Sequence, residues 1–284
     1  MLLNPFNYHS PKTLKEACNL LDTLKNARIL SGGTFLVNNL KSLKRRGLKT
    51  PDDIISLQKI PEIKGIQIKS DKIMIGAMTT LNNIAQDKNV EKHYPILRIV
   101  SENIASTQIR NMATIGGNVA CRYAWTEFAS CLIALEATLH FAEKKKLKEI
   151  SAESFFKNNA KPEGLLTSIS IPIKKDIIAI YKRVSKTPGV DLPMLTVCIK
   201  VSLKKNTLLD VRVVINDGAS FSKRDVSIEK ALEGSNLDEN IEGKFLSNLN
   251  PETYKLDNEY KKELLRIHSK YAIQKLLVQI NDNA

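Results

Sequence analysis

Two turns built on adjacent glycines constrain the folding of this chain more than any other feature. The first, Ser31-Gly32-Gly33-Thr34, follows an apolar run at 28–30 that predicts a strand and precedes a helical pattern at 35–43. The second runs from Thr114 to Asn118 and follows a helical stretch at 81–106. Glycine lets the backbone N–H groups of a turn converge on an anion, because no side chain blocks the approach. Together the turns predict a cradle for a pyrophosphate.

Neither turn matches a standard nucleotide-binding fingerprint. Both lack the Gly-x-Gly-x-x-Gly spacing of Rossmann units, and neither is a P-loop. A phosphate cradle needs no lysine where several N–H dipoles point inward at the start of a helix. Taken singly, each turn also fits a purely structural tight turn, for which glycine is common.

The segments around the turns predict alternating helices and strands. Helices are expected at 10–26, at 81–106 with a new start at Pro95, and at 126–135. Strands are expected at 53–57 and 137–142, and a hairpin at 66–76 has a polar turn at Ser70-Asp71. The fold class is therefore α+β.

The C-terminal third has a different pattern. Three β-rich runs at 177–182, 194–203 and 208–216 predict a three-stranded antiparallel sheet, and helical patterns at about 223–233 and 259–280 would pack on it. The basic segment at 174–176 makes a plausible domain boundary.

Composition bounds the function classes. The chain has 284 residues and a net charge of +13, but its basic residues are dispersed, and the densest clusters at 41–46 and 144–148 lie in no recognition module. Nucleic-acid binding is therefore not expected, whereas an acidic partner or an anionic dinucleotide would suit this charge. No membrane span or targeting segment is apparent, which predicts a soluble, cytoplasmic protein.

The four cysteines argue against a metal centre on this chain. Cys18, Cys121, Cys131 and Cys198 form no Cys-x-x-Cys pair, so neither a zinc site nor an iron–sulfur cluster is indicated. Cys131 and Cys198 lie within apolar runs and are expected to be buried as small hydrophobic residues.

The sequence around both turns resembles the two FAD-binding loops of the flavin subunits of molybdenum hydroxylases, the xanthine dehydrogenase and carbon monoxide dehydrogenase type. The matching segments are Ile-Leu-Ser-Gly-Gly-Thr-Phe-Leu at 29–36 and Gln-Ile-Arg-Asn-Met-Ala-Thr-Ile-Gly-Gly-Asn at 108–118. Segments at 75–81, 165–172, 181–182 and 231–234 fall in the same order and spacing, so the resemblance covers nearly the whole chain.

The resemblance implies a domain plan and a set of cofactor contacts. A two-part FAD-binding domain of the vanillyl-alcohol-oxidase (PCMH) type would span 1–175, divided near residue 57, and a C-terminal domain would span 176–284. Both loops would grip the pyrophosphate, Ile104 and Leu166 would supply apolar packing, and Lys182 would approach from the C-terminal domain. The positions that correspond to cofactor contacts are Ile29, Leu30, Ser31, Gly32, Gly33, Thr34, Phe35, Leu36, Ile104, Thr114, Ile115, Gly116, Gly117, Asn118, Glu127, Leu166 and Lys182.

The chain departs from the family pattern at three places. Glu127 stands where the family usually has an aspartate, Tyr123-Ala124 replaces a Ser-Pro pair, and Phe35 replaces a polar or acidic residue. Tyr123 and Trp125 are able to stack on an aromatic ring, although core or interface packing accounts for them equally well. We expect Gly117 to be the position least tolerant of a side chain, because it lies at the centre of the second loop, where the backbone must approach phosphate.

The resemblance also implies the function of an FAD-carrying electron-transfer subunit. A molybdopterin-binding large subunit would hydroxylate the substrate, and a [2Fe-2S] small subunit would pass electrons to FAD on this chain. The flavin would deliver them to an acceptor, with NAD among the candidates. No catalytic acid, base or metal ligand is assigned to this chain, because the redox chemistry belongs to the cofactor. The alternatives are a family-fold scaffold that has lost its flavin and, with less support, a basic nucleic-acid-binding protein.

Overall fold

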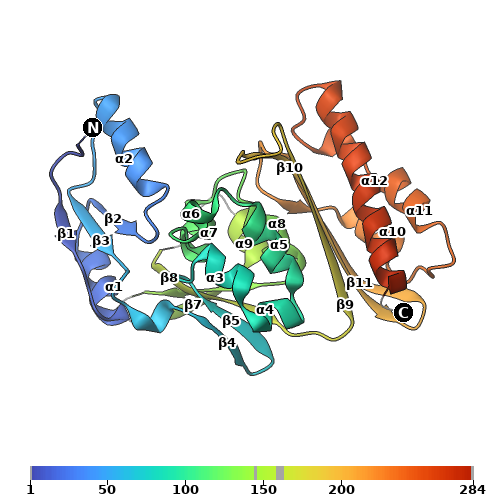
Figure 1. Cartoon of the computed structure of the whole chain (residues 1–284), viewed down its shortest axis with the longest axis horizontal. Coiled ribbons are helices and arrows are strands. Elements are labelled where there is room, and N and C mark those ends of the chain that lie inside the picture. Colours follow the sequence, from blue (N-terminus) through green and yellow to red (C-terminus); the bar gives the residue numbers. More distant parts are fainter. Residues whose placement is uncertain (1, 144–145, 158–162, 283–284) are drawn as a thin grey trace.

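The computed structural model describes residues 2–143, 146–157 and 163–282. Three sheets follow one another along the molecule, with the N-terminal sheet at one end, a central sheet and helices in the middle, and the C-terminal sheet and helices at the other end (Figure 1). Part of the basic cluster at 144–148 lies outside the described residues. No helix within the described ranges is long and apolar enough to cross a membrane.

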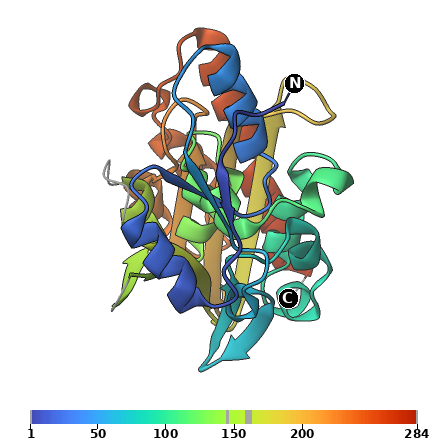
Figure 2. The same ribbon diagram turned by 90° about the vertical axis from the view of Figure 1, so that its left-hand side faces the viewer.

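The N-terminal sheet is parallel and has the order β1-β3-β2. Figure 2 views it from outside, with α2 above the strands and α1 below them. Because parallel strands end at the same edge, the turn after β2 opens on the edge where β1 and β3 also end. The elements are β1 Asn7–His9, α1 Leu14–Thr23, β2 Ala27–Leu30, α2 Leu36–Arg45, β3 Asp53–Ser56 and the 3-10 helix Pro61–Ile63.

The central sheet is antiparallel and has the order β4-β5-β8-β6-β7. Its first hairpin turns at Ser70 and Asp71, which adopt φ of 48° and 57° and so match the twist of the flanking strands. Its strands are β4 Ile66–Lys69, β5 Lys72–Gly76, β6 Thr138–Ala142, β7 Leu147–Ser151 and β8 Leu165–Pro172. Its helices are α3 Leu81–Gln86, α4 Lys88–His93, α5 Pro95–Asn103, α6 Thr107–Arg110, α7 Ile115–Cys121, α8 Glu127–Ala134 and α9 Ala152–Lys157.

The C-terminal sheet is antiparallel and has the order β12-β11-β10-β9. The sequence predicts three strands, and the structure adds a fourth of two residues, which is too short to give a periodic pattern. One face packs on the helices of the C-terminal third, and the other meets the central core through Tyr181, Cys198 and Val214. The elements are β9 Ile177–Ser185, β10 Pro193–Lys204, β11 Thr207–Asn216, β12 Lys223–Arg224, α10 Val226–Leu232, α11 Ile241–Asn248, the 3-10 helix Pro251–Thr253 and α12 Glu259–Asp282.

Local capping explains where helix predictions and structure differ. The first helix begins at Leu14, because the Thr13 hydroxyl accepts a hydrogen bond from the Glu16 N–H and caps it. The long helical stretch at 81–106 divides into α3, α4 and α5, because Asp87 caps α4 and Pro95 begins α5. Both breaks keep the apolar residues of each short helix on the central core. Cys131 and Cys198 are fully buried, as predicted.

Candidate cofactor site

The two glycine loops meet, although 83 positions separate them. The hydroxyl of Ser31 lies 2.6 Å from that of Thr114 in a hydrogen bond between the loops. A Cβ on Gly32 would lie 2.0 Å from the carbonyl oxygen of Met112, so only glycine allows this approach. In Figure 1 the chain before α2 reaches toward α6 and α7. The resemblance required the loops to act together, and the structure places them in contact.

The first loop presents a row of backbone donors. No atom in the described part of the chain accepts a hydrogen bond from the N–H groups of Gly32, Gly33, Thr34 and Phe35. Gly33 has φ of +74°, which bends the chain into the start of α2. That helix has no side-chain cap and no acidic residue in its first turn. Unpaired N–H groups at the positive end of a helix dipole suit an anion such as a pyrophosphate.

We expected the N–H groups of both loops to bind the pyrophosphate, but three N–H groups of the second loop already have acceptors within the protein. Those of Ile115 and Gly116 donate to carbonyl oxygens of segment 77–79 at 3.0 and 2.9 Å. The Gly117 N–H donates to the Thr114 hydroxyl at 3.1 Å, which caps the start of α7. These three donors stabilise the loop itself, so they are not free for a ligand, unlike the four N–H groups of the first loop.

The glycine least tolerant of a side chain is not Gly117. A Cβ on Gly116 would lie 2.6 Å from both the side chain and the carbonyl oxygen of Ala77, whereas the nearest atom to a Cβ on Gly117 would be the Thr114 hydroxyl at 3.0 Å. Gly117 has a helical rather than a positive φ, because it lies in the first turn of α7. The expectation about Gly117 was wrong, because close packing against Ala77 leaves less room for a side chain at Gly116 than at Gly117.

Asn118 carries a polar atom that fits a ligand. Its side-chain oxygen is buried and has no hydrogen-bond partner among the described residues. A buried polar atom without a partner costs free energy, so a bound group that pairs with it would stabilise the site. Asn118 lies in the same turn of α7 as Gly117. The cradle of N–H groups and this amide together fit a polar cofactor.

Three aromatic side chains lie beside the cradle. The ring of Phe35, at the end of the first loop, has its centroid 4.8 Å from that of Tyr123. Tyr123 in turn stacks on Trp125, with centroids 4.5 Å apart and planes at 11°. Phe35 is 42% exposed, and the other two are half-buried. Positions that depart from the family pattern thus come together at one place.

Glu127 faces the C-terminal sheet. Its carboxylate accepts hydrogen bonds from the Tyr181 hydroxyl at 2.8 Å and from Arg183 Nε at 3.0 Å. Burial raises the pKa of Glu127 to about 7, although Arg183 and Tyr181 act in the opposite direction. This carboxylate ties α8 to β9, and that role was not visible in the sequence.

Lys182 lies on the face of β9 that packs against α12. Its Nζ is 5.9 Å from the ring centroid of Tyr271 on α12. Its neighbours Tyr181 and Arg183 point the other way, toward Glu127. Side chains alternate along a strand, so a shift of one residue changes the face. Lys182 therefore lies on the opposite face of β9 from Tyr181 and Arg183, and its contact with the cofactor stays a prediction.

The other residues that were expected to contact the cofactor lie at the ends of the first loop or in the central core. Ile29 and Leu30 end β2, and Leu36 begins α2. Leu166 is buried in the central core, and Ile104 packs against the same cluster. The carbonyl oxygen of Ile104 accepts a hydrogen bond from the Arg110 guanidinium at 3.1 Å, which anchors the approach to the second loop.

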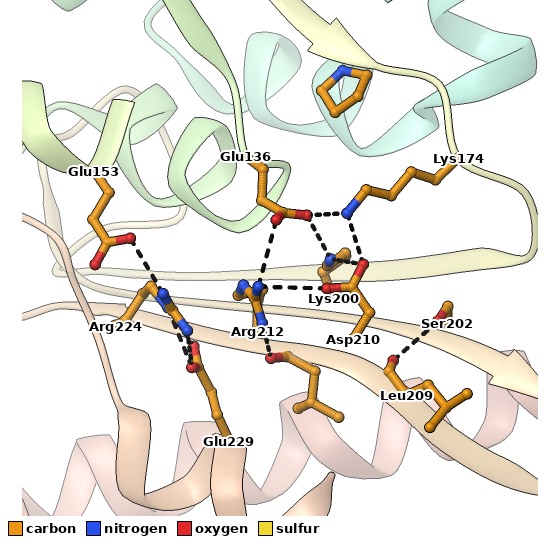
Figure 3. A network of polar contacts seen from close by, with 12 residues as sticks. Glu136, Glu153, Lys174, Lys200, Ser202, Leu209, Asp210, Arg212, Arg224 and Glu229 are labelled. Atoms are coloured by element: carbon orange, nitrogen blue, oxygen red, sulfur yellow. Dashed lines mark hydrogen bonds and ion pairs between the residues drawn. The ribbon is translucent and has the colours of Figure 1, made fainter. Parts of the chain in front are cut away.

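An ion network joins the central helices to the C-terminal sheet (Figure 3). Three cations, Lys174, Lys200 and Arg212, share the carboxylates of Glu136 and Asp210. Lys200 is fully buried, with its Nζ 2.7 Å from Asp210 and 3.2 Å from Glu136. The network spans four separate segments, so sequence patterns gave no signal for it.

Comparison with known proteins identifies the family. Residues 4–174 match the sequence model of the FAD binding domain in molybdopterin dehydrogenase. The chain is 26% identical over 271 residues to the glyceraldehyde dehydrogenase medium chain of Sulfolobus acidocaldarius, covering 92% of this chain and 95% of that one. It is 34% identical over 152 residues to the carbon monoxide dehydrogenase medium chain of Hydrogenophaga pseudoflava, covering 53% and 52%.

Solved structures share the same fold. A carbon monoxide dehydrogenase from Hydrogenophaga pseudoflava that lacks the Mo-pyranopterin moiety superposes with a TM-score of 0.89 at 23% identity, covering 98% of this chain and 99% of that one. The predicted α+β class is confirmed. Because the family match spans more than half of the sequence, this chain belongs to the family of FAD-binding medium subunits of molybdenum hydroxylases, the xanthine dehydrogenase and carbon monoxide dehydrogenase type.

Proposed function

We propose that this chain holds FAD as the electron-transfer subunit of a multi-subunit molybdenum hydroxylase, and is thus part of an oxidoreductase. One observation carries the proposal: the four unpaired N–H groups at 32–35 lie where the second loop contacts the first. This arrangement suits the pyrophosphate that links the two halves of FAD.

The residues of this chain bind and orient the cofactor. The N–H groups of Gly32 to Phe35 hold the pyrophosphate charge, helped by the dipole of α2. The hydrogen bond between Ser31 and Thr114 keeps the loops together, and the Asn118 amide pairs with a polar atom of the ligand. FAD, when bound, supplies the exchange of electrons between one-electron and two-electron carriers. No proton transfer is assigned to a side chain of this subunit.

We further propose that the partners are a molybdopterin-binding large subunit and a [2Fe-2S] small subunit, and that NAD is a candidate acceptor. Among the relatives, several carry the words medium chain or medium subunit in their names. No group of histidine, cysteine, aspartate or glutamate side chains in the described ranges is suited to hold a metal ion. Clusters that feed electrons to FAD would therefore reside on other chains.

A calorimetric series tests cofactor recognition. The flavin-free chain is titrated with FAD, ADP, FMN and riboflavin. Recognition centred on the pyrophosphate predicts that FAD and ADP bind, that FMN binds at least about tenfold more weakly than FAD, and that riboflavin binds weakest. Equal affinity for FAD and FMN would contradict the assignment of the cradle.

The second candidate is a scaffold subunit that has kept the fold and lost the flavin. One observation favours it: Glu127, which takes the place of a family aspartate, pairs with Tyr181 and Arg183. The same titration separates the two functions, because a scaffold would bind neither FAD nor ADP.

A further inference from the structure

The neighbouring rings of Phe35, Tyr123 and Trp125, which we call the aromatic stack, are only partly covered by the protein. Tyr123 and Trp125 stack with their planes at 11°, and Phe35 is tilted against Tyr123 at 51°. Large aromatic side chains bury much apolar surface when they serve the core, but Phe35 remains 42% exposed and the other two are half-buried. Their separations of 4.8 and 4.5 Å are ordinary for stacked or tilted pairs. The stack is thus an ordered apolar surface that is open to a ligand.

Two hydrogen bonds hold the backbone of the segment that carries Tyr123 and Trp125. The Thr126 N–H donates to the Tyr123 carbonyl oxygen at 3.0 Å and closes a turn between the two stacked rings. The Ala124 carbonyl oxygen accepts a hydrogen bond from the Asn216 amide of the C-terminal sheet at 2.6 Å. Because these contacts fix the segment before a ligand arrives, little conformational entropy would be lost on binding.

The stack also begins at the phosphate cradle. Phe35 supplies both the last unpaired N–H group of the first loop and the first ring of the stack. A ligand whose phosphates lie on the N–H groups of the loop is therefore brought beside an aromatic surface. FAD has a flat ring system at each end of its pyrophosphate, adenine at one and isoalloxazine at the other.

We propose that the aromatic stack is a subsite for a ring of the bound dinucleotide, so that this chain recognises its cofactor through stacking as well as through phosphate. The inference rests on the proposed function, because it takes FAD as the ligand. The shared chemistry is a flat aromatic ring tethered to a pyrophosphate. Stacking of a nucleobase on an aromatic side chain typically changes affinity by about tenfold or more.

Two substitutions and one matched control test the subsite. Tyr123→Leu removes the central ring, and Phe35→Leu removes the exposed one. Tyr260→Leu is the control, because Tyr260 is a 66% exposed tyrosine on α12, beyond the C-terminal sheet. Calorimetry with FAD, ADP and FMN is expected to show FAD binding about tenfold weaker in the first two variants and unchanged in the control. A loss for ADP identifies adenine as the stacked ring, and a loss for FMN identifies isoalloxazine.

A measurement on the unaltered chain covers the case in which a variant fails to fold. Trp125 is the one tryptophan of the sequence, so its indole N–H gives one assignable NMR resonance. A ring stacked on the aromatic stack would shift that resonance through its ring current when FAD is added. The inference is overturned if FAD binds while the indole resonance stays in place and the folded variants keep their affinity. Failure of FAD to bind at all would instead refute the proposed function.

Discussion

Substitution of Gly32 by alanine tests whether FAD binding needs the close approach of the two loops. A Cβ on Gly32 would lie 2.0 Å from the Met112 carbonyl oxygen, and real Cβ atoms essentially never come within 3.0 Å of another heavy atom. The loops would therefore have to separate by about 1 Å, since close-packed atoms resist overlap. The distance of 2.6 Å between the hydroxyls of Ser31 and Thr114 would then rise to about 3.6 Å, beyond hydrogen-bond range.

Two glycines serve as controls for Gly32→Ala. Gly117→Ala places its Cβ 3.0 Å from a hydroxyl and 3.6 Å from Ser31, which small shifts relieve. Gly47→Ala meets nothing within 4 Å but has φ of +65°, so it tests backbone strain alone. We expect Gly32→Ala to lose about 1–3 kcal/mol of unfolding free energy, the usual range for overpacking, and Gly47→Ala to lose about 1 kcal/mol.

Urea unfolding of the flavin-free proteins and calorimetric titration with FAD separate folding from binding. FAD affinity should fall by more than about tenfold in Gly32→Ala, because a displacement of about 1 Å in a positioned set of donors is costly for binding. It should stay near the wild-type value in both control variants. Wild-type FAD affinity in a folded Gly32→Ala protein would refute the claim that contact between the loops builds the site.

The remaining predictions concern the interface with the C-terminal sheet and the holoenzyme. Burial raises the pKa of Glu127 from 4.5 to about 7, so the folded chain keeps this proton after the unfolded chain has lost it. Wild-type stability measured in urea should thus fall by up to about 3 kcal/mol relative to Glu127→Gln as pH rises from about 4.5 to 7, and parallel pH profiles would contradict the burial argument. Lys200→Met should cost about 1–3 kcal/mol of unfolding free energy, because it removes a buried cation that two carboxylates share. The control is Lys175→Met, because Lys175 is exposed. Equal stabilities of the two variants would show that Lys200 contributes nothing. The isolated chain should hydroxylate neither purines nor aldehydes in a turnover assay, and product formation without added subunits would refute the assignment of catalysis to partners.

Local signals predicted those parts of the fold that local chemistry determines. The hairpin at 66–76 turns at Ser70 and Asp71 as expected, because two polar residues between alternating runs favour that turn. The strand, turn and helix order around the first loop was also correct. The fourth strand of the C-terminal sheet and helix α11 were missed, because the strand is too short and the helix pattern too weak to be periodic.

The details of the site depend on contacts between distant segments, which no single pattern encodes. Gly116 and Gly117 are adjacent in the sequence. Only the close approach of Ala77 to Gly116 leaves less space for a side chain there than at Gly117. Lys182 and Arg183 are likewise adjacent, and the pleat of β9 decides which of them faces Glu127. The resemblance to a family pointed to both loops, and their three-dimensional contacts show which of their N–H groups already have acceptors.

Backbone NMR of the isotopically labelled chain tests the central claim most directly. Amide resonances are recorded for the flavin-free protein and after addition of FAD. If the first loop holds the pyrophosphate, the amides of Gly32, Gly33, Thr34 and Phe35 should shift strongly on addition of FAD and of ADP, because each gains a charged acceptor. The amides of Ile115 and Gly116, which already donate within the protein, should shift less. FAD binding with the largest shifts elsewhere and the first-loop amides unchanged would contradict the account.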